Sequence, residues 1–120
     1  VICDGEVLGK PVDEADAIRM LKMLSGKTHH VVTGVTLGRG CRYSSFSVDT
    51  AVTFRELSDQ EIKAYVKSGE PMDKAGAYGI QGLGALLVEK IDGDFYNVVG
   101  LPVSRLAEEL HEFLKKVQSK

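Results

Sequence analysis

The sequence has little cysteine and no surplus of positive charge. Its two cysteines, Cys3 and Cys41, lie far apart and form no C-x-x-C pair, which argues against a disulfide framework or a cysteine metal site. Two reduced thiols are typical of a cytoplasmic protein, and we expect that location. With 15 basic and 17 acidic residues, the chain lacks the basic excess of proteins that bind nucleic acid polymers. A mononucleotide needs only a few local cations and stays possible.

Long apolar runs and several catalytic motifs are also absent. No stretch approaches the roughly 18 apolar residues that a membrane-spanning helix needs, so we expect no membrane partner. The sequence contains neither the dinucleotide-binding motif G-x-G-x-x-G nor a P-loop, and no G-x-S-x-G of a serine hydrolase. His29 and His30 are adjacent in a predicted strand and therefore point to opposite faces, which argues against a metal-binding pair.

What is present is the composition of one compact domain, with 43% hydrophobic and 27% charged residues, and we predict a single domain over residues 1–120. Alternating apolar residues and turn dipeptides predict strands, and apolar residues three and four apart predict helices. The predicted strands are 1–3, 6–8, 31–37, 46–54, 85–91 and 95–99, and the predicted helices are 13–24, 58–68 and 102–117. This order indicates a mixed α/β fold of the α+β type, with an elongated, largely antiparallel sheet flanked by helices.

Residues 69–84, "GEPMDKAGAYGIQGLG", contain five glycines and few residues that could fill a core. Long segments without regular structure are uncommon unless they are functional, and glycines let backbone amides approach an anion or a base edge. The Gln81 amide offers two donors and one acceptor, which suits the carbonyl and imide edge of a pyrimidine. Asp73 and Lys74 form a charge pair that either binds a ligand or ties the segment to itself.

Lys10 is the other candidate binding residue. It lies between Gly9 and Pro11, where the predicted strand ends and the backbone is held. A lysine fixed in this way suits phosphate oxygens, because it offers a full charge and three donors. A surface lysine in a loop, without a ligand, is the alternative interpretation.

The stretches "DGEVLGKPVDEADAIRMLKMLSGKTHHVVTGV" and "VTFRELSDQEIKAYVKSGEPMDKAGAYGIQGLGALLVEKIDGDFYNVVGLP" resemble the Maf family, the septum-formation-inhibitor-like nucleoside triphosphate pyrophosphatases. The likeness covers essentially the whole chain, and "DKAGAYGIQGLG" resembles the branch that acts on dTTP and UTP. The family is similar in fold to the inosine-triphosphate pyrophosphatases, in which an elongated mixed sheet borders a nucleotide cleft.

This resemblance implies hydrolysis of a nucleoside triphosphate, preferably a pyrimidine nucleotide, to the monophosphate and pyrophosphate, with Mg²⁺ or Mn²⁺ as divalent cation. Lys10 matches the family's phosphate-contacting lysine and is the expected catalytic residue, and Gln81 matches the glutamine linked to base selection. Asp73 and Lys74 match its D-K-A-G segment and are expected to organise the cleft. The metal ligands remain unassigned, and a homodimer remains open.

By the same resemblance, family members begin earlier, with a basic phosphate-binding loop and an aspartate proposed as general base. We therefore expect this chain to be the C-terminal part of a longer Maf-like protein and to be inactive or severely weakened alone. Two alternatives remain open: a non-catalytic nucleotide-binding module, and a regulatory module in septum formation or cell division.

Overall fold

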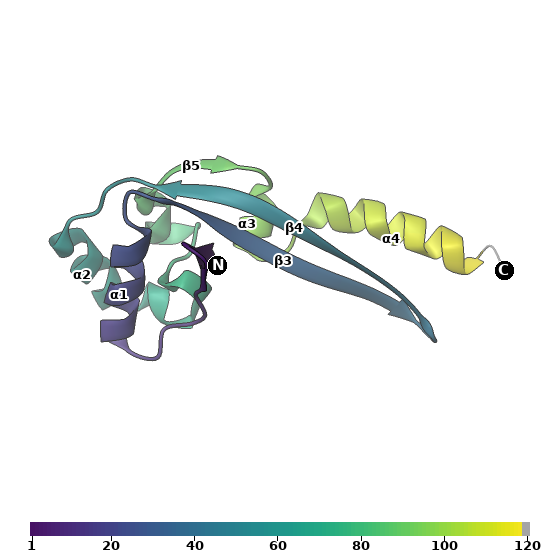
Figure 1. Ribbon diagram of the computed structural model, residues 1–120, viewed down its shortest axis with the longest axis horizontal. Coiled ribbons are helices and arrows are strands. Elements are labelled where there is room, and N and C mark those ends of the chain that lie inside the picture. The colour runs from purple at the N-terminus through teal and green to yellow at the C-terminus, as the bar shows by residue number, and fades with distance from the viewer. Residues whose placement is uncertain (119–120) are drawn as a thin grey trace.

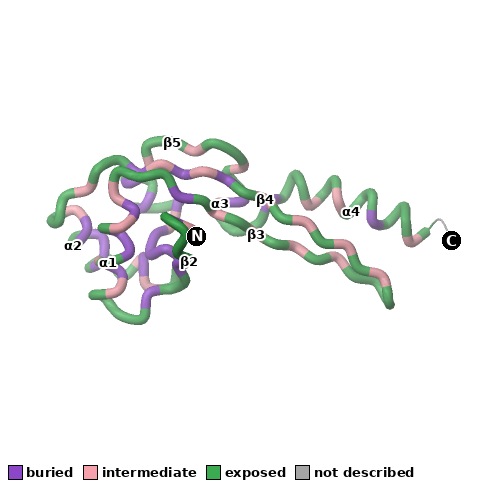
Figure 2. The backbone as a smooth tube through the Cα atoms, in the orientation of Figure 1, coloured by how far each residue is buried: buried purple, intermediate pink, exposed green. Residues whose placement is uncertain are grey.

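The computed structural model describes residues 1–118. The molecule is elongated, with principal extents of 60 × 26 × 26 Å. One end is a packed lobe that contains the first two helices, and a long β-hairpin leaves this lobe with the last helix beside it (Figure 1). Buried residues gather in the lobe and where the hairpin emerges from it, whereas the far part of the hairpin is exposed or half-buried (Figure 2).

A five-stranded sheet of order β2-β1-β3-β4-β5 forms the framework, and every neighbouring pair is antiparallel, as predicted. Its strands are β1 (Ile2–Cys3), β2 (Glu6–Val7), β3 (Thr28–Arg39), β4 (Arg42–Phe54) and β5 (Val88–Asp92). Strand β3 runs beyond the predicted end at residue 37, because Gly38 and Arg39 still pair with Tyr43 and Arg42. The turn is confined to Gly40 and Cys41, and Gly40 has a positive φ of 62°.

Two capped helices build the lobe as predicted. Helix α1 (Glu14–Leu24) begins after Asp13, whose side chain accepts from the Asp16 amide at 2.8 Å. Helix α2 (Asp59–Lys67) begins with a capping box, in which Ser58 and Glu61 satisfy each other's backbone amides. Both helices bury one apolar stripe in the core of the lobe, where they pack against each other. The buried core of the lobe includes Cys3, Leu8, Ala17, Met20, Leu21, Leu24, Val52, Phe54, Ile62, Tyr65, Val66, Ala77, Tyr78 and Leu87.

The strand predicted at 95–99 is wrong, because these residues form helix α3 (Phe95–Val99). The Asp94 side chain caps it by accepting from the amides of Tyr96 and Asn97 at 2.9 and 3.2 Å. The dipeptide Asp92-Gly93 therefore leads from β5 into a helix and not into a hairpin. The strand predicted at 85–91 also begins late, because Gly82–Leu87 is the 3₁₀ helix η3 and β5 starts at Val88.

Asn97 fixes α3 to the hairpin. Its side chain is fully buried, and its Nδ2 donates to the carbonyls of Val31 at 2.9 Å and Val48 at 3.1 Å, one on each hairpin strand. The same nitrogen contacts Thr50 Oγ1 at 3.1 Å. These bonds place the end of α3 and the turn after it against β3, which creates one wall of the site described below.

The last helix, α4 (Val103–Gln118), starts directly after Pro102 as predicted. Its Arg105 guanidinium lies 5.2 Å from the ring centre of Phe46 on β4, and Arg42 donates to the Lys116 carbonyl at 3.1 Å. Of the apolar stripe predicted for this helix, Phe113 is buried, whereas Leu110 keeps 41% of its surface exposed. No described helix is long and apolar enough to cross a membrane.

Candidate functional site

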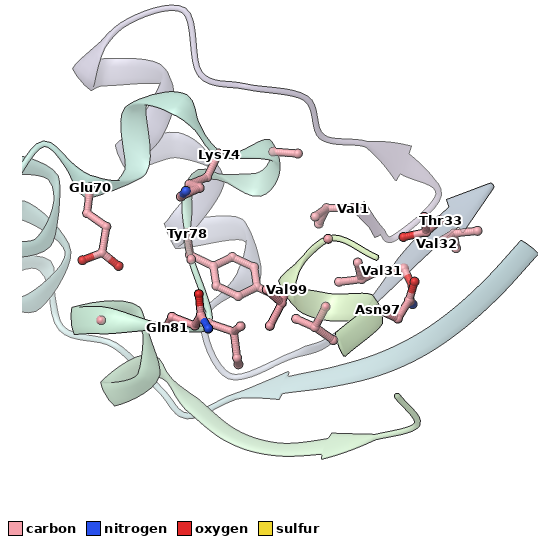
Figure 3. A pocket seen from close by; sticks show the side chains of 16 residues that line it. Val1, Val31, Val32, Thr33, Glu70, Lys74, Tyr78, Gln81, Asn97 and Val99 are labelled. Carbon is pink, nitrogen blue, oxygen red and sulfur yellow. The ribbon is translucent and has the colours of Figure 1, made fainter. Parts of the chain in front are cut away.

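A cavity of about 520 Å³ lies between the hairpin and the glycine-rich segment. Residues 78–82, together with Glu70 and Lys74, form one wall, and residues 31–33 of β3 and 97–100 at the end of α3 form the other. Figure 3 shows Lys74, Tyr78 and Gln81 on the first wall and Val31, Thr33 and Asn97 on the second. The segment singled out in the sequence therefore lines a cavity.

Backbone conformations that few side chains adopt give this segment its shape. Gly69, with φ of 80°, ends α2 and leads into the 3₁₀ helix η1 (Glu70–Asp73). In the following 3₁₀ helix η2 (Ala75–Ala77), Gly76 has φ of 73° and the fully buried Ala77 has φ of 63°. A positive φ in a non-glycine residue is strained, and such residues gather at functional sites.

The predicted binding residues fall into two groups. Lys74 and Gln81 both line the cavity, whereas Lys10 and Asp73 are not among the described residues of its wall. Lys10 is nevertheless close to the segment, because the amide of Gly76 donates to the carbonyl of its neighbour Gly9 at 3.0 Å. The four binding residues predicted from the sequence thus lie in one region of the molecule. Of these, Lys74 and Gln81 line the cavity.

The side chains of Lys74 and Gln81 are available to a ligand. Lys74 Nζ lies 3.8 Å from Asp73 Oδ1, and both side chains are exposed. An exposed ion pair contributes only about 0 to 1 kcal/mol, so this contact ties the segment weakly and does not hold the ammonium away from an anion. Gln81 is exposed, and its side-chain amide makes no hydrogen bond to another described residue.

Tyr78, on the first wall, is buried and belongs to an aromatic cluster beneath the cavity. Its hydroxyl lies 2.7 Å from Nε2 of His29, and the two rings and that of Phe54 meet edge to face. Burial lowers the pKa of His29 to about 4 and raises the pKa of Tyr78, so both are neutral near pH 7. His29 therefore supports Tyr78 and carries no charge near the cavity.

The two adjacent histidines point to opposite faces, as predicted. His29 is fully buried, whereas His30 is exposed and its Nδ1 lies 2.8 Å from Asp49 Oδ1. Among residues 1–118, no group of three or more His, Cys, Asp and Glu side chains could hold a metal ion.

Glu70 is the site residue that sequence reasoning missed. Its carboxylate accepts from the amides of Leu83 and Gly84, both at 3.1 Å, and from the hydroxyl of Tyr65 at 3.0 Å. That hydroxyl in turn accepts from the amide of Gly79 at 3.1 Å. One signal could have suggested Glu70: like Lys10, it lies between a glycine and a proline, which hold its backbone. Nothing in the sequence indicates its distant partners.

Comparison with known proteins gives a consistent result. The profile of the family described as "Maf-like protein" matches residues 1–113. A curated relative from Bacillus velezensis, named dTTP/UTP pyrophosphatase, is 56% identical over 113 residues, which is 94% of this chain and 60% of the relative. Relatives of the same name from Bacillus pumilus and from Bacillus cereus strain AH820 are 53% and 54% identical. The chain spans about three-fifths of the length of these relatives.

Proposed function

Because this chain belongs to the Maf-like protein family, we propose that it is part of a nucleoside triphosphate pyrophosphatase that acts on dTTP and UTP. In the proposed reaction, water adds to the α phosphorus and the bond to the β phosphate breaks, giving the nucleoside monophosphate and pyrophosphate. The observation that carries the proposal is that Gln81 and Lys74, a base-reading amide and a cation, line one cavity. The two free thiols, Cys3 and Cys41, support a cytoplasmic location.

The cavity suits a nucleotide in size and in lining. Its volume of about 520 Å³ falls within the range of roughly 300 to 1,000 Å³ typical of small-molecule sites. Val31 and Val99 offer apolar surface to a base or sugar, and the Gln81 amide can donate to a carbonyl and accept from an imide N–H of uracil or thymine. Cytosine has an amino group and no imide N–H, so it matches this amide less well.

The triphosphate would meet two lysines. Lys74 supplies a positive charge at the cavity wall, and Lys10 supplies a second one next to Gly9, which is bonded to the segment through Gly76. In this arrangement Lys10 contacts the part of the triphosphate that extends beyond the cavity. Hydrogen bonds to charged groups are each worth about 1.5 to 3 kcal/mol, so either lysine alone would matter to binding.

The described residues do not fit a metal centre held by the protein, since residues 1–118 contain no suitable cluster of ligands. Mg²⁺ or Mn²⁺, which the family resemblance implies, would enter on the phosphates, because Mg²⁺ commonly binds through substrate phosphates and few protein groups.

Water activation is also not assigned to the cavity residues. Glu70 is the carboxylate among the described residues of its wall, and three donors already occupy its oxygens. A general base must reach the water that it activates, whereas this carboxylate is engaged in holding the backbone at Leu83 and Gly84. This observation favours a second candidate function for the chain on its own, a nucleotide-binding module without turnover, which calorimetry with dTTP and a pyrophosphate-release assay would distinguish from the enzyme.

Separate replacement of Gln81 and of Lys10 should show that the first residue recognises the base and the second recognises the phosphates. We expect Gln81→Ala to reduce the ratio of kcat/KM for dTTP over dCTP by about tenfold, the loss of roughly one well-placed hydrogen bond. Lys10→Ala should instead lower kcat/KM for both nucleotides by about tenfold or more and leave the ratio unchanged. Pyrophosphate release should be measured on this chain and on a version extended at its N-terminus to the length of the relatives.

Gln60→Ala on α2 and Lys90→Ala on β5 are matched controls, because both residues are exposed and neither lines the cavity. If Gln81→Ala and Lys10→Ala behave like these controls in the active version, the proposed site is wrong. If the extended version hydrolyses no nucleoside triphosphate, the proposed reaction is wrong.

A further inference from the structure

Glu70 binds the C-terminal end of the segment 79–84, which carries Gln81. It lies just after α2, yet its side chain reaches Leu83 and Gly84, which are 13 and 14 residues further along the chain. Oε2 accepts from the amide of Leu83, and Oε1 accepts from the amide of Gly84. The amides at the C-terminal end of the segment are thus held by a single carboxylate.

Tyr65 extends this connection to the other end of the segment. Its hydroxyl donates to Glu70 Oε1 at 3.0 Å and accepts from the amide of Gly79 at 3.1 Å. Burial raises the pKa of Tyr65, which keeps the hydroxyl protonated near pH 7. Gly79 and Gly84 are therefore bonded to the same pair of side chains, and we call Glu70 and Tyr65 the loop clamp.

The loop clamp holds the two ends of the segment 79–84 in close backbone contact. A Cβ on Gly84 would lie 1.7 Å from the carbonyl oxygen of Gly79, so the two glycines touch through their backbones. Gly82, next to Gln81, also approaches the carboxylate, since a Cβ there would lie 3.1 Å from Glu70 Oε2. Gln81 sits between these fixed points, while its own amide is free of partners among the described residues.

We propose that Glu70 is a positioning residue that sets the base selectivity of the site by holding the Gln81 loop in its reading position; this proposal rests on the proposed function. The carboxylate acts through the loop and does not touch the base. A shift of about 1 Å in a positioned group can cost roughly a hundredfold in rate, so a clamp on the backbone suits a residue that must discriminate between similar bases. The substrate class it selects is a pyrimidine nucleotide with an imide N–H.

The test compares Glu70→Ala, Glu70→Gln and the control Glu89→Gln, a change at an exposed glutamate on β5, all in the version extended at its N-terminus. We expect Glu70→Ala to lower the dTTP-to-dCTP ratio of kcat/KM by about tenfold, mainly through a higher KM for dTTP. Glu70→Gln keeps one acceptor oxygen and should retain part of the ratio, and Glu89→Gln should match the unchanged protein. Hydrogen exchange at the amides of Leu83 and Gly84 should quicken in Glu70→Ala.

Tyr65→Phe provides a second route if Glu70→Ala does not fold, because it removes one hydroxyl from the same clamp. It should lower the nucleotide ratio in the same direction by about threefold or more, because the bond to the Glu70 carboxylate and the bond from the Gly79 amide are both lost. An unchanged ratio in a folded clamp variant whose Leu83 and Gly84 amides exchange faster would overturn the proposal, since Glu70 would then be structural only. Absence of turnover and of nucleotide binding in the unsubstituted, extended protein would instead overturn the proposed function.

Discussion

Gly84→Ala is expected to destabilise the protein by about 3 kcal/mol or more, which is the upper end of what overpacking a tight interior costs. The added Cβ would lie 1.7 Å from the carbonyl oxygen and 2.8 Å from the carbonyl carbon of Gly79, and 2.9 Å from the hydroxyl of Tyr65. Two of these atoms are backbone and cannot rotate away. The segment must therefore open, and the bond from the Gly84 amide to Glu70 would be lost with it.

Urea denaturation followed by circular dichroism would measure this loss as a lower midpoint. Gly34→Ala is the matched control, because Gly34 lies in β3 with open space around the position of a Cβ and no positive φ. Alanine there should leave the midpoint almost unchanged. Equal midpoints for the two variants would contradict the close backbone contact between Gly79 and Gly84.

The second large effect is a loss of stability at acid pH caused by His29. Burial holds its pKa at about 4 in the folded protein, below the ordinary value of 6.5. The folded state therefore resists protonation, and the unfolded state does not. The stability that the neutral ring provides is fully present above about pH 6.5 and is lost as the pH falls from 6.5 towards 4. The difference corresponds to roughly 3 kcal/mol.

Urea denaturation at a series of pH values between 7 and 4 would test this expectation. His29→Phe should be less sensitive to pH over this range, although the Tyr78 hydroxyl loses its partner. His30→Gln is the control, because His30 is exposed, and this variant should retain the loss of stability that His29 causes. Exposed carboxylates titrate in all three proteins, so the comparison isolates His29. Identical pH profiles for the unsubstituted protein and His29→Phe would show that His29 is not the responsible group.

Much of the fold could be predicted because its signals are local. The capping residues Asp13 and Ser58 mark the starts of α1 and α2, and alternation along 46–54 gives β4 with one half-buried face. The failure at 95–99 has a local cause too. The Asp92-Gly93 dipeptide is a common hairpin signal, but Asp94 follows it and caps a helix, and the capping bonds decide the conformation.

The site could be predicted only in part, because its assembly depends on contacts between distant residues. The glycine content of 69–84 indicated a functional segment, and two of its members, Lys74 and Gln81, do face one cavity. The role of Glu70 could not be found in this way, since its partners lie 13 and 14 residues away and are backbone amides that every sequence contains. Nor could spacing show that Asn97 would bind the carbonyls of both hairpin strands and so build the opposite wall.

The two ends of the long hairpin of β3 and β4 are expected to differ in local stability. Its lobe end carries fully buried side chains such as Val52 and Phe54, whereas its far end, from Gly34 to the turn and back, has ladder hydrogen bonds, half-buried residues and the contacts of α4 with Phe46 and Arg42. Local stability follows buried contacts, so the tip belongs to a separate, weaker cooperative unit. The wall residues 31–33 lie where this unit joins the lobe. Local unfolding of the hairpin that starts at its tip is therefore expected to stop at the edge of the cavity.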